Sequence, residues 1–167
     1  MRALQVSRLA PDHAGCAIAD LPVPEPGPSE VRVRVRAAAV NFPDLLMTRG
    51  AYQLKPDLPF VPGLEFSGDV DAVGADVEGW APGDAVIGGN RFGAMAEYCI
   101  VPAAALRRKP AALDWAAAAC PVAYLTAYVA LVRCARVAPG DWVLVQGSGG
   151  VSVVALQMAR MMGCRVI

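Results

Sequence analysis

The sequence has no excess of charge of either sign and few charged residues altogether. Among its 167 residues, 15 Lys and Arg balance 15 Asp and Glu, and charged residues make up 18% against 56% hydrophobic ones. A chain without a basic excess has little with which to neutralise phosphates, so nucleic acid is excluded as an expected partner. Disorder is also excluded, because disordered chains combine low hydrophobicity with high net charge.

Paired cysteine motifs and long uncharged apolar runs are also missing. The five cysteines include no C-x-x-C pair, which predicts free thiols and a cytoplasmic location. No run of signal-peptide length occupies the N-terminus. The longest uncharged run, residues 115–132, is rich in alanine and interrupted by Pro121. It predicts a buried core helix rather than a membrane span, so we expect no membrane partner.

Short alternating segments dominate the first two thirds of the chain. Residues 30–40 alternate valine with arginine, and this period of two predicts a strand with one dry and one wet face. The arginine row could form a ligand patch, but we interpret it as a solvated sheet face. Many short strands separated by Gly, Pro and Asp predict a compact barrel. Further strands are expected at 2–8, 67–73, 85–87 and 94–101, with a short helix at 41–49.

The pattern becomes helical near Pro110. Asp114 is predicted to cap a helix that runs to about residue 135 and is broken near Pro121. A buried strand at 142–146 and a helix at 150–162 follow.

A second strand is expected to begin after Gly163, which completes a βαβ unit. The expected fold is therefore mixed β and α/β, with a β-barrel domain at 1–113. Residues 114–167 are expected to form a linker helix and the first βαβ unit of a doubly wound domain.

A glycine loop joins the predicted strand at 142–146 to the helix at 150–162. It reads G-x-G-x-x-S and contains the candidate cofactor-binding residues Gly147, Ser148, Gly149, Gly150, Val151 and Ser152. Such a loop lets the backbone approach a pyrophosphate, whose charge then lies at the N-terminus of the helix. Glycines also mark plain turns, but the strand before the loop and the helix after it favour dinucleotide binding. The residue that distinguishes NAD from NADP is expected about 20 residues after the first glycine, at or beyond Ile167.

The chain resembles the medium-chain dehydrogenase/reductases, in particular their zinc-independent quinone oxidoreductase and enoyl-reductase branch. The resemblance rests on VNFPDLL at 40–46, RGAY at 49–52, PGLEFSG at 62–68, LTAY at 125–128 and the glycine loop. It implies a GroES-like barrel followed by a Rossmann domain, NADP or NAD as cofactor, a small-molecule substrate and a homodimer. It also implies that the chain corresponds to the N-terminal half of a usual member.

Zinc is not expected. Zinc-dependent relatives place C-H-x-D and G-H-E stretches where this chain has Asn41 and Leu64. The only histidine, His13, lies outside both stretches, and no cysteine cluster is available as a second site. We interpret His13 as a surface loop residue.

The resemblance also implies roles for three side chains, and each has a structural alternative. Tyr52 is the candidate proton donor, or else an aromatic side chain that packs over a loop. Asn41 would orient the nicotinamide ribose or the substrate, or else cap a turn. Thr126 would lie near the nicotinamide, or else bond its own helix carbonyl. Asp44 and Glu65 are expected to hold neighbouring loops.

The sequence thus predicts a reductase that transfers hydride from NAD(P)H to quinones, enones or enoyl thioesters without zinc. A zinc-free alcohol dehydrogenase-like enzyme is the alternative favoured by the loop spacing, and a truncated non-catalytic relative is a third. We further expect the 167-residue chain alone to bind NAD(P)H weakly and to associate through its unpaired strand edges.

Overall fold

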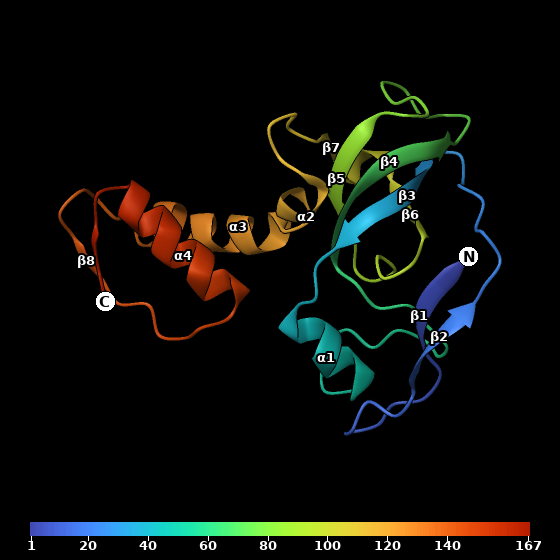
Figure 1. The fold of residues 1–167 in the computed structure, drawn as a ribbon, viewed down its shortest axis with the longest axis horizontal. Helices are drawn as coiled ribbons and strands as arrows, with labels where there is room; N and C mark the ends of the chain where they lie inside the picture. The colour runs from blue at the N-terminus through green and yellow to red at the C-terminus, as the bar shows by residue number, and fades with distance from the viewer. The chain divides into compact units, whose positions relative to one another are not determined.

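The computed structural model describes all residues, 1–167, and divides into two compact units (Figure 1). The first unit is Met1–Cys120 and the second is Pro121–Ile167. Each unit is described by itself. The first is built mainly from β-strands and the second mainly from helices, which confirms the mixed β and α/β character expected from the sequence.

A five-stranded antiparallel sheet forms the centre of the first unit, in the order β6-β3-β4-β5-β7. Its inward-facing side chains make the main core, which includes the fully buried Val33 and Phe66. The order leaves β6 and β7 as edges, so hydrogen bonds do not close the strands into the expected barrel. The strands are β3 (Glu30–Ala38), β4 (Glu65–Val73), β5 (Ala85–Gly89), β6 (Tyr98–Pro102) and β7 (Leu106–Arg108).

A separate two-stranded ribbon, β1 (Arg2–Val6) and β2 (Cys16–Asp20), lies beside this sheet. Single bridges join β1 to Ala96 and Phe60. The alternation of polar and apolar residues predicts β1 but not β2 or β7, because neither of these two strands alternates strongly. A short 3₁₀ turn, η1 (Ala103–Ala105), precedes β7.

The arginine row of β3 lies on a solvated face, as expected. Arg32 pairs with Asp71 at 2.6 Å and Arg36 with Asp69 at 2.6 Å, both on the neighbouring strand β4. The valines that alternate with these arginines face the core. The row therefore forms cross-strand ion pairs on the sheet surface.

The uncharged run 115–132 is broken into three pieces rather than forming one buried helix. Asp114 caps α2 (Trp115–Ala118) by accepting the Ala117 N–H at 2.7 Å, and a new helix begins at Pro121. This confirms the cap and the break. The pieces that follow are α3 (Pro121–Tyr128) and a π-helical segment, η2 (Val129–Cys134).

The expected burial of that run is wrong for its later part. Only a stripe that includes Ala127 and Leu131 is buried, because α4 (Gly150–Met161) is the helix that packs against α3, and it covers one face. Leu125 is 63% exposed. No helix in the structure has both the length and the apolar character that a membrane crossing requires.

The βαβ unit expected at the end of the chain is present. β8 (Trp142–Val143) and β9 (Arg165–Val166) pair in parallel, and α4 connects them. The prediction of a buried strand over 142–146 is wrong in length and burial: β8 has two residues and Trp142 is 65% exposed. The reason is that β9 is its single neighbour, so much of β8 remains uncovered.

Candidate functional site

The short helix α1 (Phe42–Thr48) brings several of the predicted residues together in the first unit. Asn41 is its N-cap residue, and Pro43 lies in the first turn, where a missing N–H costs nothing. The Asp44 carboxylate accepts the backbone N–H of Asn41 at 2.8 Å. These local features explain why the helix begins where it does.

Asp44 also joins α1 to a distant loop. Its second oxygen accepts the backbone N–H of Gly63 at 2.9 Å, and the side chain is buried. Burial raises the pKa of Asp44, although the N–H groups of Asn41 and Gly63 oppose this shift by stabilising the carboxylate. The residue therefore holds two loops together, as the sequence predicted.

Asn41 uses its side chain to contact Glu65 at the start of β4. Its amide nitrogen donates to the Glu65 carboxylate at 2.8 Å, and Glu65 is fully buried. Glu65 thus fixes the orientation of the Asn41 amide. Asn41 therefore occupies the N-cap position, which was one of its two predicted roles, and its side chain also contacts Glu65.

A metal site has few candidate ligands here. No three His, Cys, Asp or Glu side chains lie close enough together to hold a metal ion. Burial, and after it the nearby Glu65 carboxylate, raise the pKa of the Cys120 thiol, so that the thiolate needed for metal binding or nucleophilic attack is disfavoured.

Tyr52 follows α1 by a few residues and is half-buried. It packs, with Leu54 and Leu64, against a small apolar cluster made by Val6, Met47 and Phe60. No hydrogen bond engages its hydroxyl group in the structure. The Tyr52 ring therefore packs against neighbouring side chains, as the structural alternative predicted, while its hydroxyl has no protein partner.

In the second unit, the glycine loop leads into the N-terminus of α4. Gly147 has φ +141°, a conformation that favours glycine. A Cβ at Gly147 would lie 2.7 Å from the Ser152 hydroxyl oxygen. The small residue at each of these two positions therefore allows close packing within the loop.

The N-terminus of α4 has the features of a phosphate-binding site. Gly149 is its N-cap residue, with no side chain to bond the free N–H groups, and the first turn carries no acidic residue. A Cβ added at Gly149 or Gly150 would meet no atom within 4 Å. Space and unpaired donors are thus available where the pyrophosphate of a dinucleotide would lie, so these residues fit such a cofactor.

Thr126 lies on α3, which packs against α4 through Ala123, Ala127 and Val154. Its side chain is exposed, and its hydroxyl donates to the Val122 carbonyl at 2.7 Å. The Thr126 hydroxyl thus bonds a carbonyl of its own helix, which was the structural alternative given for this residue.

A contact that sequence reasoning missed involves His13. Interpreted above as a surface loop residue, it is half-buried and its Nδ1 lies 2.6 Å from the Thr48 hydroxyl oxygen, while Arg49 contacts Nε2. Thr48 is 35 residues away in the sequence, and no local pattern indicates such a pairing.

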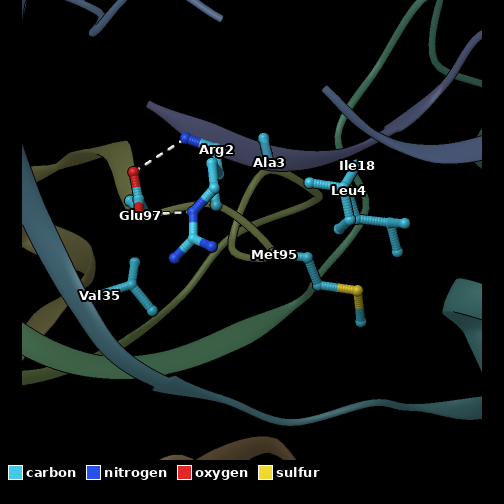
Figure 2. A pocket seen from close by; sticks show the side chains of 8 residues that line it. Arg2, Ala3, Leu4, Ile18, Val35, Met95 and Glu97 are labelled. Atoms are coloured by element: carbon cyan, nitrogen blue, oxygen red, sulfur yellow. Dashed lines mark hydrogen bonds and ion pairs between the residues drawn. The ribbon is translucent and has the colours of Figure 1, made fainter. Parts of the chain in front are cut away.

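The first unit also contains a groove of about 480 Å³ between the ribbon and the sheet (Figure 2). Figure 2 shows Arg2 and Glu97 hydrogen-bonded together at one end, and the apolar Leu4, Ile18 and Met95 at the other. None of the residues predicted from the sequence to act on a cofactor or substrate lines it.

The sequence profile of the alcohol dehydrogenase GroES-like domain matches residues 27–111. The chain belongs to the medium-chain dehydrogenase/reductase family, of which this domain is a part.

Among curated proteins, quinone oxidoreductase-like protein 2 of Mus musculus is 48% identical over 118 residues, which cover 70% of this chain and 34% of that protein. The quinone oxidoreductase of Pongo abelii is 35% identical and the alignment covers 100% of this chain and 52% of that protein. The chain therefore spans between a third and about half of these relatives.

Solved structures agree with this assignment. A probable oxidoreductase from Mycobacterium abscessus has a TM-score of 0.92 with 41% identity, over 99% of this chain and 53% of that one. The quinone oxidoreductase of Thermus thermophilus, solved also in complex with NADPH, has a TM-score of 0.83 with 39% identity, over 99% of this chain and 52% of that one.

The role of Asp44 can be tested by Asp44→Asn. The variant replaces one acceptor oxygen by an NH2 group that faces a backbone N–H, so the free energy of unfolding should fall by about 1–3 kcal/mol. Urea unfolding measures this change. Asp12→Asn is the matched control: its carboxylate is exposed and bonds one backbone N–H, which Asn can still accept, so the change should stay within about 0.5 kcal/mol. Equal effects of the two variants would contradict the structural role of Asp44.

Proposed function

We propose that this chain is part of an NAD(P)H-dependent reductase that transfers hydride to quinones, α,β-unsaturated carbonyl compounds or enoyl thioesters without zinc. The observation that carries the proposal is the open N-terminus of α4, preceded by a glycine loop and lacking any acidic residue in its first turn. The names of the relatives support the reaction class: quinone oxidoreductases, and an enoyl reductase that is 26% identical.

The absence of zinc is proposed from the side chains that replace its ligands. An amide at Asn41 and an isobutyl group at Leu64 stand where zinc-dependent relatives have thiolate and imidazole, and Glu65 already accepts the Asn41 amide. Without a metal to stabilise an alkoxide, the favourable substrates are those that delocalise the developing charge over a conjugated system.

The bound nicotinamide supplies the hydride. The N–H groups at the start of α4 would hold the pyrophosphate, and Asn41 would present its amide, oriented by Glu65, to the ribose or the substrate. When hydride adds to the β-carbon of an enone, the electron pair of the double bond moves toward the carbonyl oxygen and one proton must follow. Tyr52 would donate this proton, because its hydroxyl has no competing protein partner.

The proposal includes NADP or NAD as cofactor, with Thr126 near the nicotinamide, a cytoplasmic location and a homodimer. The NADPH complex of the Thermus thermophilus relative supports the first. Five cysteines without a disulfide fit a reducing compartment.

A second candidate function is that of a zinc-free alcohol dehydrogenase-like enzyme. The G-x-G-G-V spacing of the loop favours it, as does an NAD-dependent alcohol dehydrogenase structure with 42% identity and a TM-score of 0.89. Comparing NADPH-dependent reduction of a quinone with NAD-dependent oxidation of an alcohol distinguishes the two activities. A folded protein that binds neither cofactor would instead be a non-catalytic relative.

Cofactor binding at α4 can be tested by Gly150→Asp. An acidic side chain at a helix N-terminus favours the helix but repels a phosphate, so NADPH affinity should fall without loss of folding. Gly150→Asn is the isosteric neutral control, and fluorescence titration should give at least about tenfold weaker NADPH binding for Asp than for Asn. Equal affinities would place the cofactor elsewhere.

The proton-donor role can be tested by Tyr52→Phe. Turnover of an enone should fall roughly 10²-fold while NADPH affinity stays nearly unchanged. Quinone reduction should fall less, because the reduced oxygens take protons from solvent. Tyr98→Phe on β6 is the matched control and should leave both rates unchanged; an unaltered enone rate in Tyr52→Phe would return Tyr52 to a packing role.

Independence from zinc can be tested by elemental analysis of the active protein. We expect no stoichiometric zinc and no loss of turnover on chelation, because Asn41 and Leu64 lack the ligand atoms that zinc prefers. About one zinc per chain, removed together with activity, would contradict this part of the proposal.

A further inference from the structure

The hydrogen bonds around His13 define its tautomer. The Thr48 hydroxyl donates its proton to the Leu45 carbonyl at 2.8 Å, so its oxygen can only accept from His13 Nδ1, 2.6 Å away. Arg49 has only donors, and its Nε and Nη2 lie 3.2 and 2.9 Å from His13 Nε2. In this arrangement Nδ1 donates to Thr48 and Nε2 accepts from Arg49, so both ring nitrogens are engaged.

These bonds attach the loop 9–15 to the end of α1. The Ala10 N–H donates to the Thr48 carbonyl at 3.1 Å, and Leu9 covers Gly50 so closely that a Cβ there would lie 2.8 Å from Leu9 Cδ1. His13 itself has φ +61°, which is uncommon for a residue other than glycine. Thr48 is buried beneath this contact, so the attachment is partly shielded from water.

The end of α1 leads directly to Tyr52. Gly50, with φ +71°, ends the helix: its N–H donates to the Met47 carbonyl at 3.0 Å and the Ala51 N–H donates to the Leu46 carbonyl at 2.9 Å. Cys16, at the far end of the His13 loop, packs against the same apolar cluster as Tyr52. The loop thus reaches Tyr52 by two routes, through the backbone after Thr48 and through that cluster.

We propose that His13 is a positioning residue for the reaction: by bridging Thr48 and Arg49 it holds segment 50–52 and so places the Tyr52 hydroxyl. The inference rests on the proposed function of Tyr52 as proton donor. His13 acts through Tyr52 and does not itself touch the substrate.

A double-mutant cycle with an enone substrate tests this dependence. His13→Ala should lower kcat about tenfold with the NADPH dissociation constant unchanged. In a Tyr52→Phe background the same change should have little further effect, because the group that His13 positions is already gone. An equal tenfold loss in both backgrounds, or no loss in the first, would overturn the proposal.

Two further variants separate positioning from general destabilisation. His13→Asn tolerates the left-handed backbone and can still donate to Thr48, although its side chain is too short to reach Arg49, so it should recover part of the lost kcat. Asp12→Asn, in the same loop, should leave kcat unchanged. A His13→Asn variant no better than His13→Ala in a protein of normal thermal stability would count against the bridge to Thr48.

Hydrogen exchange supplies a readout that does not depend on activity. In the 167-residue chain, His13→Ala should speed exchange of the Gly50 and Ala51 amides about tenfold, while amides of β4 and β5 stay unchanged. If the wild-type protein has no activity but His13→Ala still exchanges these amides faster, the proposed function is overturned and the attachment of segment 50–52 is supported. Unchanged exchange would overturn the inference about His13 even in an active enzyme.

Discussion

One buried carboxylate holds together the part of the first unit on which the proposed chemistry depends. Asp44 takes a backbone N–H from Asn41 with one oxygen and from Gly63 with the other, and so links the start of α1 to the loop that enters β4. A carboxylate in this position loses its hydration, and two N–H donors compensate in part. Because the Asp44 carboxylate bonds backbone N–H groups on both sides, it sets the spacing between Asn41 and Glu65 independently of their own side chains.

That spacing has a chemical consequence. The Asn41 amide donates to the buried Glu65 carboxylate, so the fold fixes the direction in which the amide points. The proposed site then depends on oriented amide and hydroxyl groups rather than on a Lewis acid. Under the proposed function, such groups would favour acceptors that spread negative charge over several atoms, such as quinones and conjugated carbonyl compounds, over simple ketones.

The proposed anion site of the second unit is built from backbone groups rather than side chains. Gly149 and Gly150 leave open space at the start of α4, and the helix supplies donors and a favourable dipole for an anion. Its apolar surface is only partly covered, since α3 and α4 pack on one face each and β8 has one neighbour. The sequence-based expectation of full burial assumed more neighbours than this unit contains.

The sequence by itself determined the features that depend on near neighbours in the chain. The period of two in β3, the Asp114 cap, the break at Pro121 and the glycine loop before α4 all follow from residues within a few positions of each other. Only the tertiary structure decided which polar groups meet across long separations. Asn41 bonds Glu65, which is 24 residues away in the sequence, and His13 bonds Thr48, which is 35 residues away. A hydrogen bond between distant residues needs two precise positions, and only the fold supplies them. A single histidine or glutamate forms no sequence pattern from which its partner could be predicted. The same reason explains the missed strand β7 and the short β8: a strand's length depends on the strand beside it, and pairing is a property of the assembled sheet.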